Sequence, residues 1–229
     1  AAKNRGYNIL LMDGQLDVAM ISMLEQKFEK SRFTRVDSDV IDRLIAKEEH
    51  KEANLESNQR EILSSVFRSQ LPQIKKVEFN VETQALGENG APIMITQSEY
   101  MRRMKEMANI QAGMSFYGEM PNMYNLVLNA DHKLVKQVLT DADNSCKAAL
   151  EPIESEMANL NNRRKELQKA QEGKKTEDIP QAEKDELNDI EKKISDETTK
   201  KQAVLGEYAN GNKIIHQLID LALLQNNML

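Results

Sequence analysis

The residue types that most often carry catalysis or bind metals are few in this sequence. Its three histidines, His50, His132 and His216, lie far apart along the chain. No His-x-x-x-His or Cys-x-x-Cys pair offers the ligand spacing of a metal site, and no Gly-x-Ser-x-Gly motif marks a nucleophilic serine. Residues 87–90, Gly-Glu-Asn-Gly, are too short for a phosphate-binding loop and lack the Gly-Lys-Ser/Thr that would follow one. The sequence therefore predicts no catalytic residue and no metal site.

Carboxylates are abundant, but most of them fall on segments with the charge density of solvated helices. Asp131 and His132 are adjacent at the point where a helix is expected to begin, after a strand that ends at Leu128. We interpret them as the start of that helix, in preference to a catalytic pair. Asn129 or Asp131 would be its N-cap, and His132 would lie in its first turn.

Methionine is the most informative residue type. Seven of the 12 methionines lie between Met94 and Met123, although the sequence has no tryptophan. The segment 97–110 is predicted to form a helix that Ser98 caps. The apolar residues of this helix and of the loop after it are Tyr100, Met101, Met104, Met107, Ile110, Met114 and Phe116.

Two interpretations of this methionine-rich face stay open at the level of the residues. In the first, the face packs into a domain core and methionine fills gaps between other side chains. In the second, the helix is exposed or mobile and binds varied apolar partners, because methionine is unbranched, flexible and polarizable. The residues alone favour the first interpretation, since a methionine stripe at helical spacing usually belongs to a core.

Composition limits the classes of protein to consider. The 229 residues suggest one or two domains, and the 40% of apolar residues suffice for a core. A net charge of −6 is a poor match to nucleic acid, which requires clustered Lys and Arg. No apolar run approaches the ~20 residues of a membrane span, and no signal peptide is visible at Ala1. The single cysteine, Cys146, is typical of a reducing cytoplasm.

The elements that would position these residues begin with a predicted strand–helix–strand unit. Residues 7–12 and 33–36 have the character of short buried strands. Between them, Leu16, Met20, Met23, Leu24 and Phe28 recur at helical spacing. Strands joined in this way are parallel, so residues 1–45 are predicted to be the end of a larger α/β domain, as a truncated βαβ unit.

Residues 46–229 are predicted to form a second domain of α+β class. A helix is expected over 55–71, followed by strands over 74–81 and 92–96 that we expect to pair as a hairpin around the 87–90 turn. A third strand is expected over 124–128. Together they predict a small mixed helix–sheet domain.

An antiparallel coiled-coil hairpin is predicted over 144–208, inserted into this domain. Apolar residues at three- and four-residue spacing run through both arms, with the turn at 173–180. Pro152 is expected either to mark the start of the first arm or to kink it.

The last helix, 212–229, is apolar around most of its circumference and must be buried on nearly all sides. We expect its cover to be another subunit or a segment beyond this sequence, and two-fold dimers are the commonest assembly.

Several motifs resemble bacterial members of the heat-shock protein 90 family. Residues 6–17, 24–28 and 33–39 resemble the last βαβ unit of the family's middle domain. The segment 120–135, with Met-Pro-Asn-Met-Tyr-Asn-Leu-Val-Leu-Asn and Asp-His-Lys-Leu-Val, is similar to its C-terminal domain. Residues 217–224 resemble its first dimerisation helix. The motifs occur in the family's order along the whole chain.

The resemblance implies a homodimeric, ATP-dependent chaperone that binds partly folded client proteins. It implies that ATP, Mg²⁺ and the arginine that aids hydrolysis belong upstream of Ala1, so no cofactor and no ATPase activity are expected in this chain. It raises the second interpretation of the methionine-rich face above the first. The client-contact residues would then be Tyr100, Met101, Met104, Met107, Ile110, Met114 and Phe116.

The resemblance also implies a dimer interface on the last helix. The family uses two helices per subunit, and the second would follow Leu229. The 144–208 hairpin looks like an insertion with no function that the family supplies, so a coiled-coil scaffolding module remains the alternative. The expected dimer contacts are Ile214, Ile215, Leu218, Ile219, Ala222 and Leu223.

Overall fold

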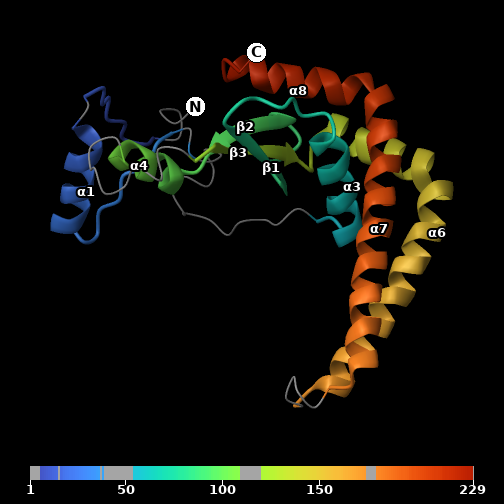
Figure 1. The fold of residues 1–229 in the computed structure, drawn as a ribbon. Coiled ribbons are helices and arrows are strands. Elements are labelled where there is room, and N and C mark those ends of the chain that lie inside the picture. Colours follow the sequence, from blue (N-terminus) through green and yellow to red (C-terminus); the bar gives the residue numbers. More distant parts are fainter. Residues whose placement is uncertain are drawn as a thin grey trace. The chain divides into compact units, whose positions relative to one another are not determined.

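The computed structural model describes residues 6–14, 16–36, 38, 54–108, 120–173 and 179–228. Helices and a single sheet alternate along this part of the chain (Figure 1), which confirms the α+β class. The elements are α1 (Asp17–Lys27), α3 (Ser57–Arg68), β1 (Val77–Gln84), β2 (Ile93–Gln97), α4 (Glu99–Ala108), β3 (Asn122–Asn129), α6 (Lys133–Gln171), α7 (Gln181–Gly211) and α8 (Lys213–Gln225).

The chain divides into two compact units, which we describe separately. Unit 1 comprises Ala1–Glu56, Leu71–Val135 and Gln217–Leu229, and unit 2 comprises Ser57–Gln70 and Lys136–His216. Unit 1 thus holds α1, α4 and the sheet, and unit 2 holds α3 and nearly all of α6 and α7. The predicted domain boundary between residues 45 and 46 lies outside the described residues.

The sheet of unit 1 has the order β1-β3-β2. β3 pairs parallel with β1, from Val77 opposite Asn122 onward, and antiparallel with β2, where Ile93 lies opposite Leu128. The predicted hairpin of β1 with β2 is therefore wrong. β3 carries three consecutive fully buried residues, Leu126 to Leu128, and such a continuous apolar run favours the central position of a sheet.

The end of β3 explains why the 85–90 segment is not a hairpin turn. The buried Asn129 side chain accepts hydrogen bonds from the amides of Leu86 (3.1 Å) and Asp131 (3.1 Å), and donates one to the Gly87 carbonyl (2.9 Å). Asp131 accepts another from the Gly87 amide at 2.8 Å, and Gly87 has a φ of 78° that favours glycine. These bonds hold the loop against the end of β3, where it passes from β1 on one side of that strand to β2 on the other.

The predicted caps of the following helix are wrong for the same reason. Asn129 and Asp131 are occupied with the 85–90 loop, so neither of them caps α6. The Nδ1 atom of His132 accepts the hydrogen bond from the Leu134 amide instead, at 3.2 Å. His132 thus precedes the first helical residue, Lys133, and its ring accepts a hydrogen bond from a backbone amide of the first turn.

The N-terminal segment of unit 1 retains one element of the predicted βαβ unit. The helix is present as α1, but residues 7–14 and 31–35 form no strand. A parallel strand is stable only beside a paired neighbour, and the described residues offer none to either segment. The predicted pair of strands is therefore wrong for the described structure.

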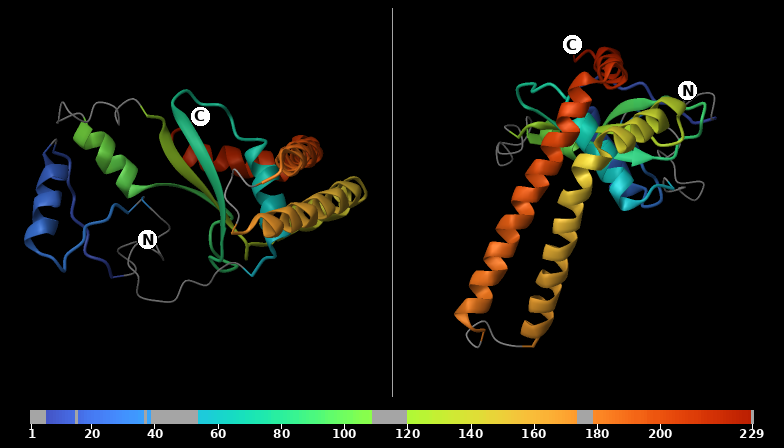
Figure 2. Two further views of the ribbon diagram at one scale, coloured as in Figure 1. Left: turned by 60° about the horizontal axis from the view of Figure 1, so that its bottom comes forward. Right: turned by 90° about the vertical axis from the view of Figure 1, so that its right-hand side faces the viewer.

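Unit 2 contains the predicted helical hairpin. α6 and α7 run side by side as two long antiparallel arms in both views (Figure 2), and Arg163 Nε binds Glu186 Oε1 across them at 2.7 Å. α6 starts at Lys133, far earlier than predicted, and Pro152 lies inside it. Pro152 therefore does not mark the start of the first arm.

A buried lysine joins three helices of unit 2. Lys201 of α7 is 4% exposed, and its Nζ atom lies 3.0 Å from Asn58 Oδ1 and 3.0 Å from Glu61 Oε2, both on α3. The same atom lies 3.1 Å from Glu154 Oε1 on α6. A buried ammonium group needs this number of acceptors to offset its lost hydration, so the cluster fixes how the three helices meet.

The last helix is confirmed as α8. Its N-cap is Asn212, whose Oδ1 accepts hydrogen bonds from the amides of Ile214 (3.0 Å) and Ile215 (3.3 Å). Neither α8 nor any other described helix is long and apolar enough to cross a membrane.

Candidate functional site

The candidate site is α4, the helix that carries the methionine-rich face. It begins at Glu99, directly after Ser98, and its described part ends at Ala108. Tyr100 is 62% exposed, and Met101, Met104 and Met107 are half-buried. The other predicted contact residues, Ile110, Met114 and Phe116, lie outside the described residues. The structure thus places four of the seven predicted residues together on one helix with part of their apolar surface open.

The charged side chains of α4 make its specific contacts with the rest of unit 1. Lys105 Nζ donates to the carbonyl oxygen of Met120 and, at 2.7 Å, to Oδ1 of Asn122, the first residue of β3. Burial, followed by the nearby charge of Lys76, lowers the pKa of Lys105. An ordinary surface helix solvates its charges and buries its apolar stripe. The charged side chains Arg103, Lys105 and Glu106 of α4 instead bind other residues of unit 1.

Arg103 binds α1 and the segment that follows it. Its guanidinium group donates to both carboxylate oxygens of Glu25, at 2.7 and 3.4 Å, and to the carbonyl oxygen of Phe33. Glu25 also accepts a hydrogen bond from the Phe33 amide at 2.7 Å. Burial raises the pKa of Glu25, but the hydrogen bonds from Arg103 and the Phe33 amide outweigh it, and the pKa lies below that of an ordinary glutamate.

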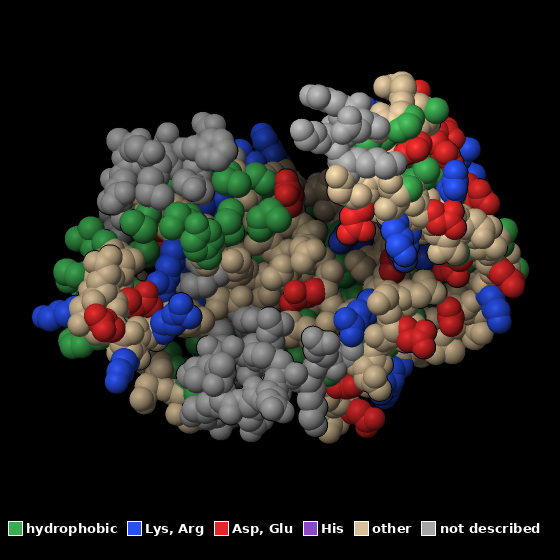
Figure 3. Space-filling model, turned by 90° about the horizontal axis from the view of Figure 1, so that it is seen from below, with side chains coloured by type: hydrophobic (Ala, Val, Ile, Leu, Met, Phe, Trp, Pro, Cys, Tyr) green, Lys and Arg blue, Asp and Glu red, His purple; other side chains and the backbone are tan. Residues whose placement is uncertain are grey.

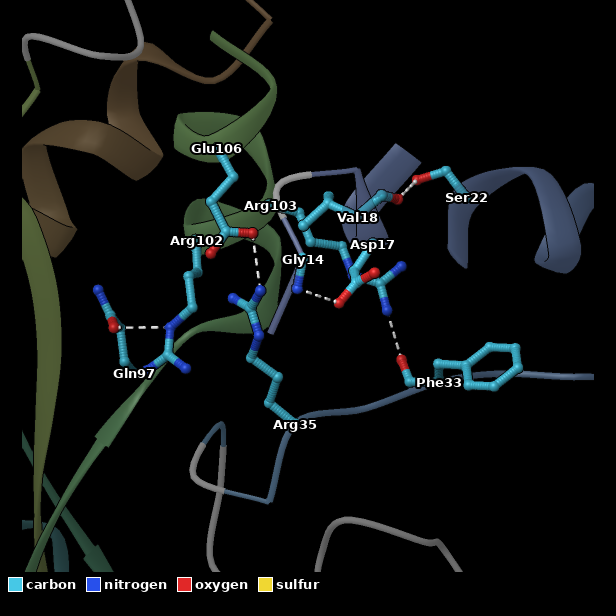
Figure 4. A network of polar contacts seen from close by, with 10 residues as sticks. All are labelled: Gly14, Asp17, Val18, Ser22, Phe33, Arg35, Gln97, Arg102, Arg103 and Glu106. Atoms are coloured by element: carbon cyan, nitrogen blue, oxygen red, sulfur yellow. Dashed lines mark hydrogen bonds and ion pairs between the residues drawn. The ribbon is translucent and has the colours of Figure 1, made fainter. Parts of the chain in front are cut away.

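A second ion pair lies one helical turn further along α4. Glu106 accepts a hydrogen bond from Arg35 at 2.7 Å, with both side chains about one-third exposed. Figure 4 shows both contacts of α4. Its Glu106 meets Arg35, and its Arg103 points to the Phe33 carbonyl. Sequence analysis missed both pairs. The spacing of Arg103 and Glu106 places them on one face of α4, but no local signal connects them to residues 71 and 78 positions away.

Other apolar side chains of unit 1 are also exposed. On the face drawn in Figure 3, hydrophobic side chains gather over the part of unit 1 that holds α1 and α4. Most of the apolar residues that recur at helical spacing in and around α1 are among the exposed ones, and Val18 is the buried residue of α1. Large exposed apolar patches commonly mark sites of interaction with proteins. The exposed residues are Ile9, Leu10, Leu11, Leu16, Met20, Met23, Phe28, Val36 and Tyr100.

Most of the predicted dimer residues of α8 are buried within the single chain, where they are not available to a second subunit. Ile214 is half-buried, and the other five are at most 5% exposed in the single chain. The exposed large apolar residues of α8 are Leu221 (46%) and Leu224 (62%), which the sequence did not single out. Their three-residue spacing puts them on one side of the helix, but the buried Ile215 and Leu218 share this spacing, so the sequence held no signal for their exposure. The buried residues of this set are Ile215, Leu218, Ile219, Ala222 and Leu223.

The described residues offer little for catalysis. Among them, no group of three or more His, Cys, Asp or Glu side chains lies close enough to hold a metal ion. A groove of about 570 Å³ runs between α6 and α7, lined by Leu160 and by charged residues that include Glu156 and Lys193. Cys146 is buried, and burial raises the pKa of its thiol, which disfavours the reactive thiolate.

Comparison with known proteins shows what kind of protein carries this helix. No family model and no solved structure matches the sequence. The chain is 69% identical over all 229 residues to the chaperone protein HtpG of Bacteroides fragilis. The chain is similar to one part of the HtpG chaperones along its whole length. It is also 66% identical to HtpG of Bacteroides thetaiotaomicron over 229 residues, and 45% identical to HtpG of Porphyromonas gingivalis over 230.

The alignments cover all of this chain but only 33 to 34% of those relatives. The chain thus spans about one third of the length of the HtpG proteins it matches. The resemblance to the heat-shock protein 90 family is confirmed by these identities.

Proposed function

We propose that this chain supplies a client-contact surface of an HtpG chaperone, with α4 at its centre. The observation that carries the proposal is that the charged and the apolar side chains of α4 have different roles. Arg103, Lys105 and Glu106 bind unit 1, while Tyr100 and the three methionines keep exposed apolar surface. A helix tethered by its charges can present apolar groups to a partner without losing its own position.

The chemistry of these apolar groups suits unfolded proteins as ligands. Methionine has three rotatable bonds and a polarizable sulfur, so Met101, Met104 and Met107 can adapt to differently shaped apolar segments. The exposed Tyr100 adds a larger ring at the start of the same helix. The proposed ligands are therefore partly folded proteins of varied sequence, and the expected affinity is modest.

The proposal assigns no catalytic residue to this chain. The resemblance implies that ATP and Mg²⁺ bind upstream of Ala1, and the sequence contains no phosphate-binding loop. ATP hydrolysis would then act on this surface only through a conformational change in the longer protein.

The test of the client surface is a triple variant, Met101→Ser, Met104→Ser and Met107→Ser, in an assay for suppression of client aggregation. We expect most of the suppression to be lost with α-helix content unchanged. A matched variant with leucine at the same three positions keeps the apolar area and should retain much of the activity. If the serine variant suppresses aggregation as well as the parent chain, α4 is not the client surface.

We further propose that α8 contributes to a homodimer through its exposed residues. Leu221 and Leu224 are the most exposed apolar residues of α8, because five of the six predicted contacts are already buried in one chain. Sedimentation equilibrium should show that Leu224→Asp dissociates a dimer while leaving the fold intact. Leu218→Asp is the contrasting variant: its side chain is 5% exposed, so we expect unfolding. An unchanged mass for Leu224→Asp would exclude this interface.

A scaffolding role is the second candidate, and the groove between α6 and α7 is the observation that favours it. A helix or extended segment of a partner could lie in this groove against Leu160. The test is to remove the part of the hairpin that lines the groove, residues 156–200, and replace it with a short turn. This variant keeps Glu154 and Lys201, so unit 2 should still fold. Loss of a partner together with unchanged aggregation suppression would favour the scaffold.

A further inference from the structure

Two ion pairs of opposite polarity connect α4 to the segment from α1 to Arg35. On α4 the positive Arg103 precedes the negative Glu106 by three residues, and their partners are the negative Glu25 and the positive Arg35. If α4 moved by one turn, Glu106 would come to face Glu25, and two like charges would repel. The pairs therefore specify one register of α4, in addition to any affinity they contribute.

The surroundings of these pairs make them reversible. The side chains of Arg103 and Glu25 are 18% and 22% exposed, and those of Arg35 and Glu106 are 31% and 35% exposed. Pairs with this much access to water are screened by salt and contribute modestly to stability. Contacts of this strength can open during normal function, whereas a fully buried pair would hold permanently.

The methionines of α4 are half-buried while both pairs are formed. Met101, Met104 and Met107 each keep only part of their surface accessible in this arrangement. Movement of α4 away from the α1 segment is expected to expose more of them, because α4 packs against α1. The closed arrangement thus limits the apolar surface that α4 can offer.

We propose that Glu25–Arg103 and Arg35–Glu106 form an electrostatic latch, which restrains α4 against the α1 segment and restricts client access to its methionines. This inference rests on the proposed function of α4. The latch has two states. When both ion pairs are formed, α4 keeps its register and part of the methionine surface stays covered. When they break, α4 can move and its methionines become more accessible. Clients bind the open form more tightly and shift the equilibrium toward it.

Hydrogen exchange of the α4 amides measures the latch without any client. The variants are made in the full chain of 229 residues. Glu25→Gln and Glu106→Gln each remove one charge without changing the size of the side chain. We expect α4 to exchange about fivefold faster in each variant, and the parent chain to approach that rate at high salt. Glu29→Gln is the matched control, because Glu29 is an exposed carboxylate of the same segment.

A charge exchange tests the pairing itself. Arg35→Glu alone places two carboxylates opposite each other and should speed exchange in α4. Arg35→Glu combined with Glu106→Arg restores opposite charges and should slow it again. If the double variant exchanges as fast as the single one, Arg35 and Glu106 do not act as a pair, and the latch is overturned.

Binding of a permanently unfolded protein, reduced and carboxymethylated α-lactalbumin, links the latch to client access. We expect Glu25→Gln to bind it about fivefold more tightly than Glu29→Gln does. Faster exchange with unchanged or weaker binding would overturn the restriction of client access. Unchanged exchange in both latch variants would overturn the latch itself.

The serine triple variant separates this inference from the proposed function in the same binding assay. If it binds the unfolded protein as well as the parent chain, the client role of α4 fails. The exchange rates of Glu25→Gln and Glu106→Gln still decide whether the latch exists.

Discussion

The two units both use charged side chains to join helices, but they bury them to different degrees. In unit 2, Lys201 is 4% exposed and has three acceptors from α3 and α6. In unit 1, Arg103 and Arg35 join α4 to the α1 segment with side chains that are 18% and 31% exposed. The cation is shielded from water in unit 2 and partly exposed in unit 1, so we expect the Lys201 cluster to open less readily than the two pairs of α4.

The difference fits the positions of the proposed functions. The Lys201 cluster supports the base of a long hairpin, where a fixed geometry is needed. The Glu25 and Arg35 pairs hold the helix that is proposed to contact clients, where movement is useful. Low local stability is common at elements that bind ligands.

The largest expected effect is at the Lys201 cluster. Lys201→Met keeps the length of the side chain but leaves Glu61 and Glu154 facing each other without a cation. We expect a loss of about 2–3 kcal/mol in the free energy of unfolding, somewhat below that for a fully buried pair, because both carboxylates retain access to water. Urea denaturation followed by circular dichroism measures the change.

Lys200→Met is the control for this prediction. Lys200 is the neighbouring lysine, it is 62% exposed, and it pairs with Glu197 on its own helix. Its replacement should change stability far less than that of Lys201. Equal effects at the two positions would show that burial of Lys201 does not strengthen its role.

The next largest effect tests whether unit 1 also contains a buried polar junction. Asn129 is fully buried and makes three hydrogen bonds, two of which hold the 85–90 loop to the end of β3. Asn129→Ala leaves the part-buried amides of Leu86 and Asp131 without this acceptor, and we expect a loss of about 2 kcal/mol. Asn129→Asp keeps the acceptor, but it buries a charge and sets a carboxylate oxygen against the Gly87 carbonyl, so its effect should be larger. A result in the reverse order would contradict this assignment.

The features that the sequence predicted are those that local periodicity encodes. α4, α8 and the two arms of the hairpin follow from apolar residues at helical spacing, and Asn212 is a recognisable cap for α8. The order of the strands was not accessible in this way, because β1 pairs with β3, about 45 residues later. Nothing local distinguishes that pairing from a hairpin with β2.

In the candidate site, too, the sequence predicted what local spacing encodes and missed what depends on long-range contacts. Tyr100 and the methionines were identified from spacing, whereas the role of Glu25 and Arg35 depends on contacts across more than 70 residues. On α8 the periodicity marked the apolar residues but not which of them the chain itself covers. Leu221 and Leu224 differ from Ile219 and Leu223 only in their tertiary environment.

A smaller effect is expected at the Glu25–Arg103 pair. Glu25→Gln should lower the free energy of unfolding by about 0.5–1 kcal/mol, because the pair is partly exposed, and the loss should shrink at high salt. The measurement is a urea titration at low and high ionic strength, with Glu29→Gln as the matched control. A loss that does not depend on salt would indicate that Glu25 acts through packing, and the contrast between the two units would weaken.

The smallest and most specific effect is the pH dependence of that difference. The pKa of Glu25 is lower in the folded chain than in the unfolded one, so its contribution is fully present above the unfolded value and is lost as pH falls through the folded value. The stability difference between the parent chain and Glu25→Gln should therefore be constant from neutral pH to about pH 5 and vanish in more acidic solution.

Titration of the Glu25 carboxyl carbon by NMR identifies the cause of this behaviour. Arg103→Met removes the strongest hydrogen-bond donor to Glu25, while the burial that raises its pKa persists in part. The pKa of Glu25 should then rise relative to the parent chain, and the acid-sensitive stability difference should shrink with it. If the pKa stays low in Arg103→Met, the Phe33 amide and Arg32 hold the carboxylate, and Arg103 is not the partner on which the contribution of Glu25 depends.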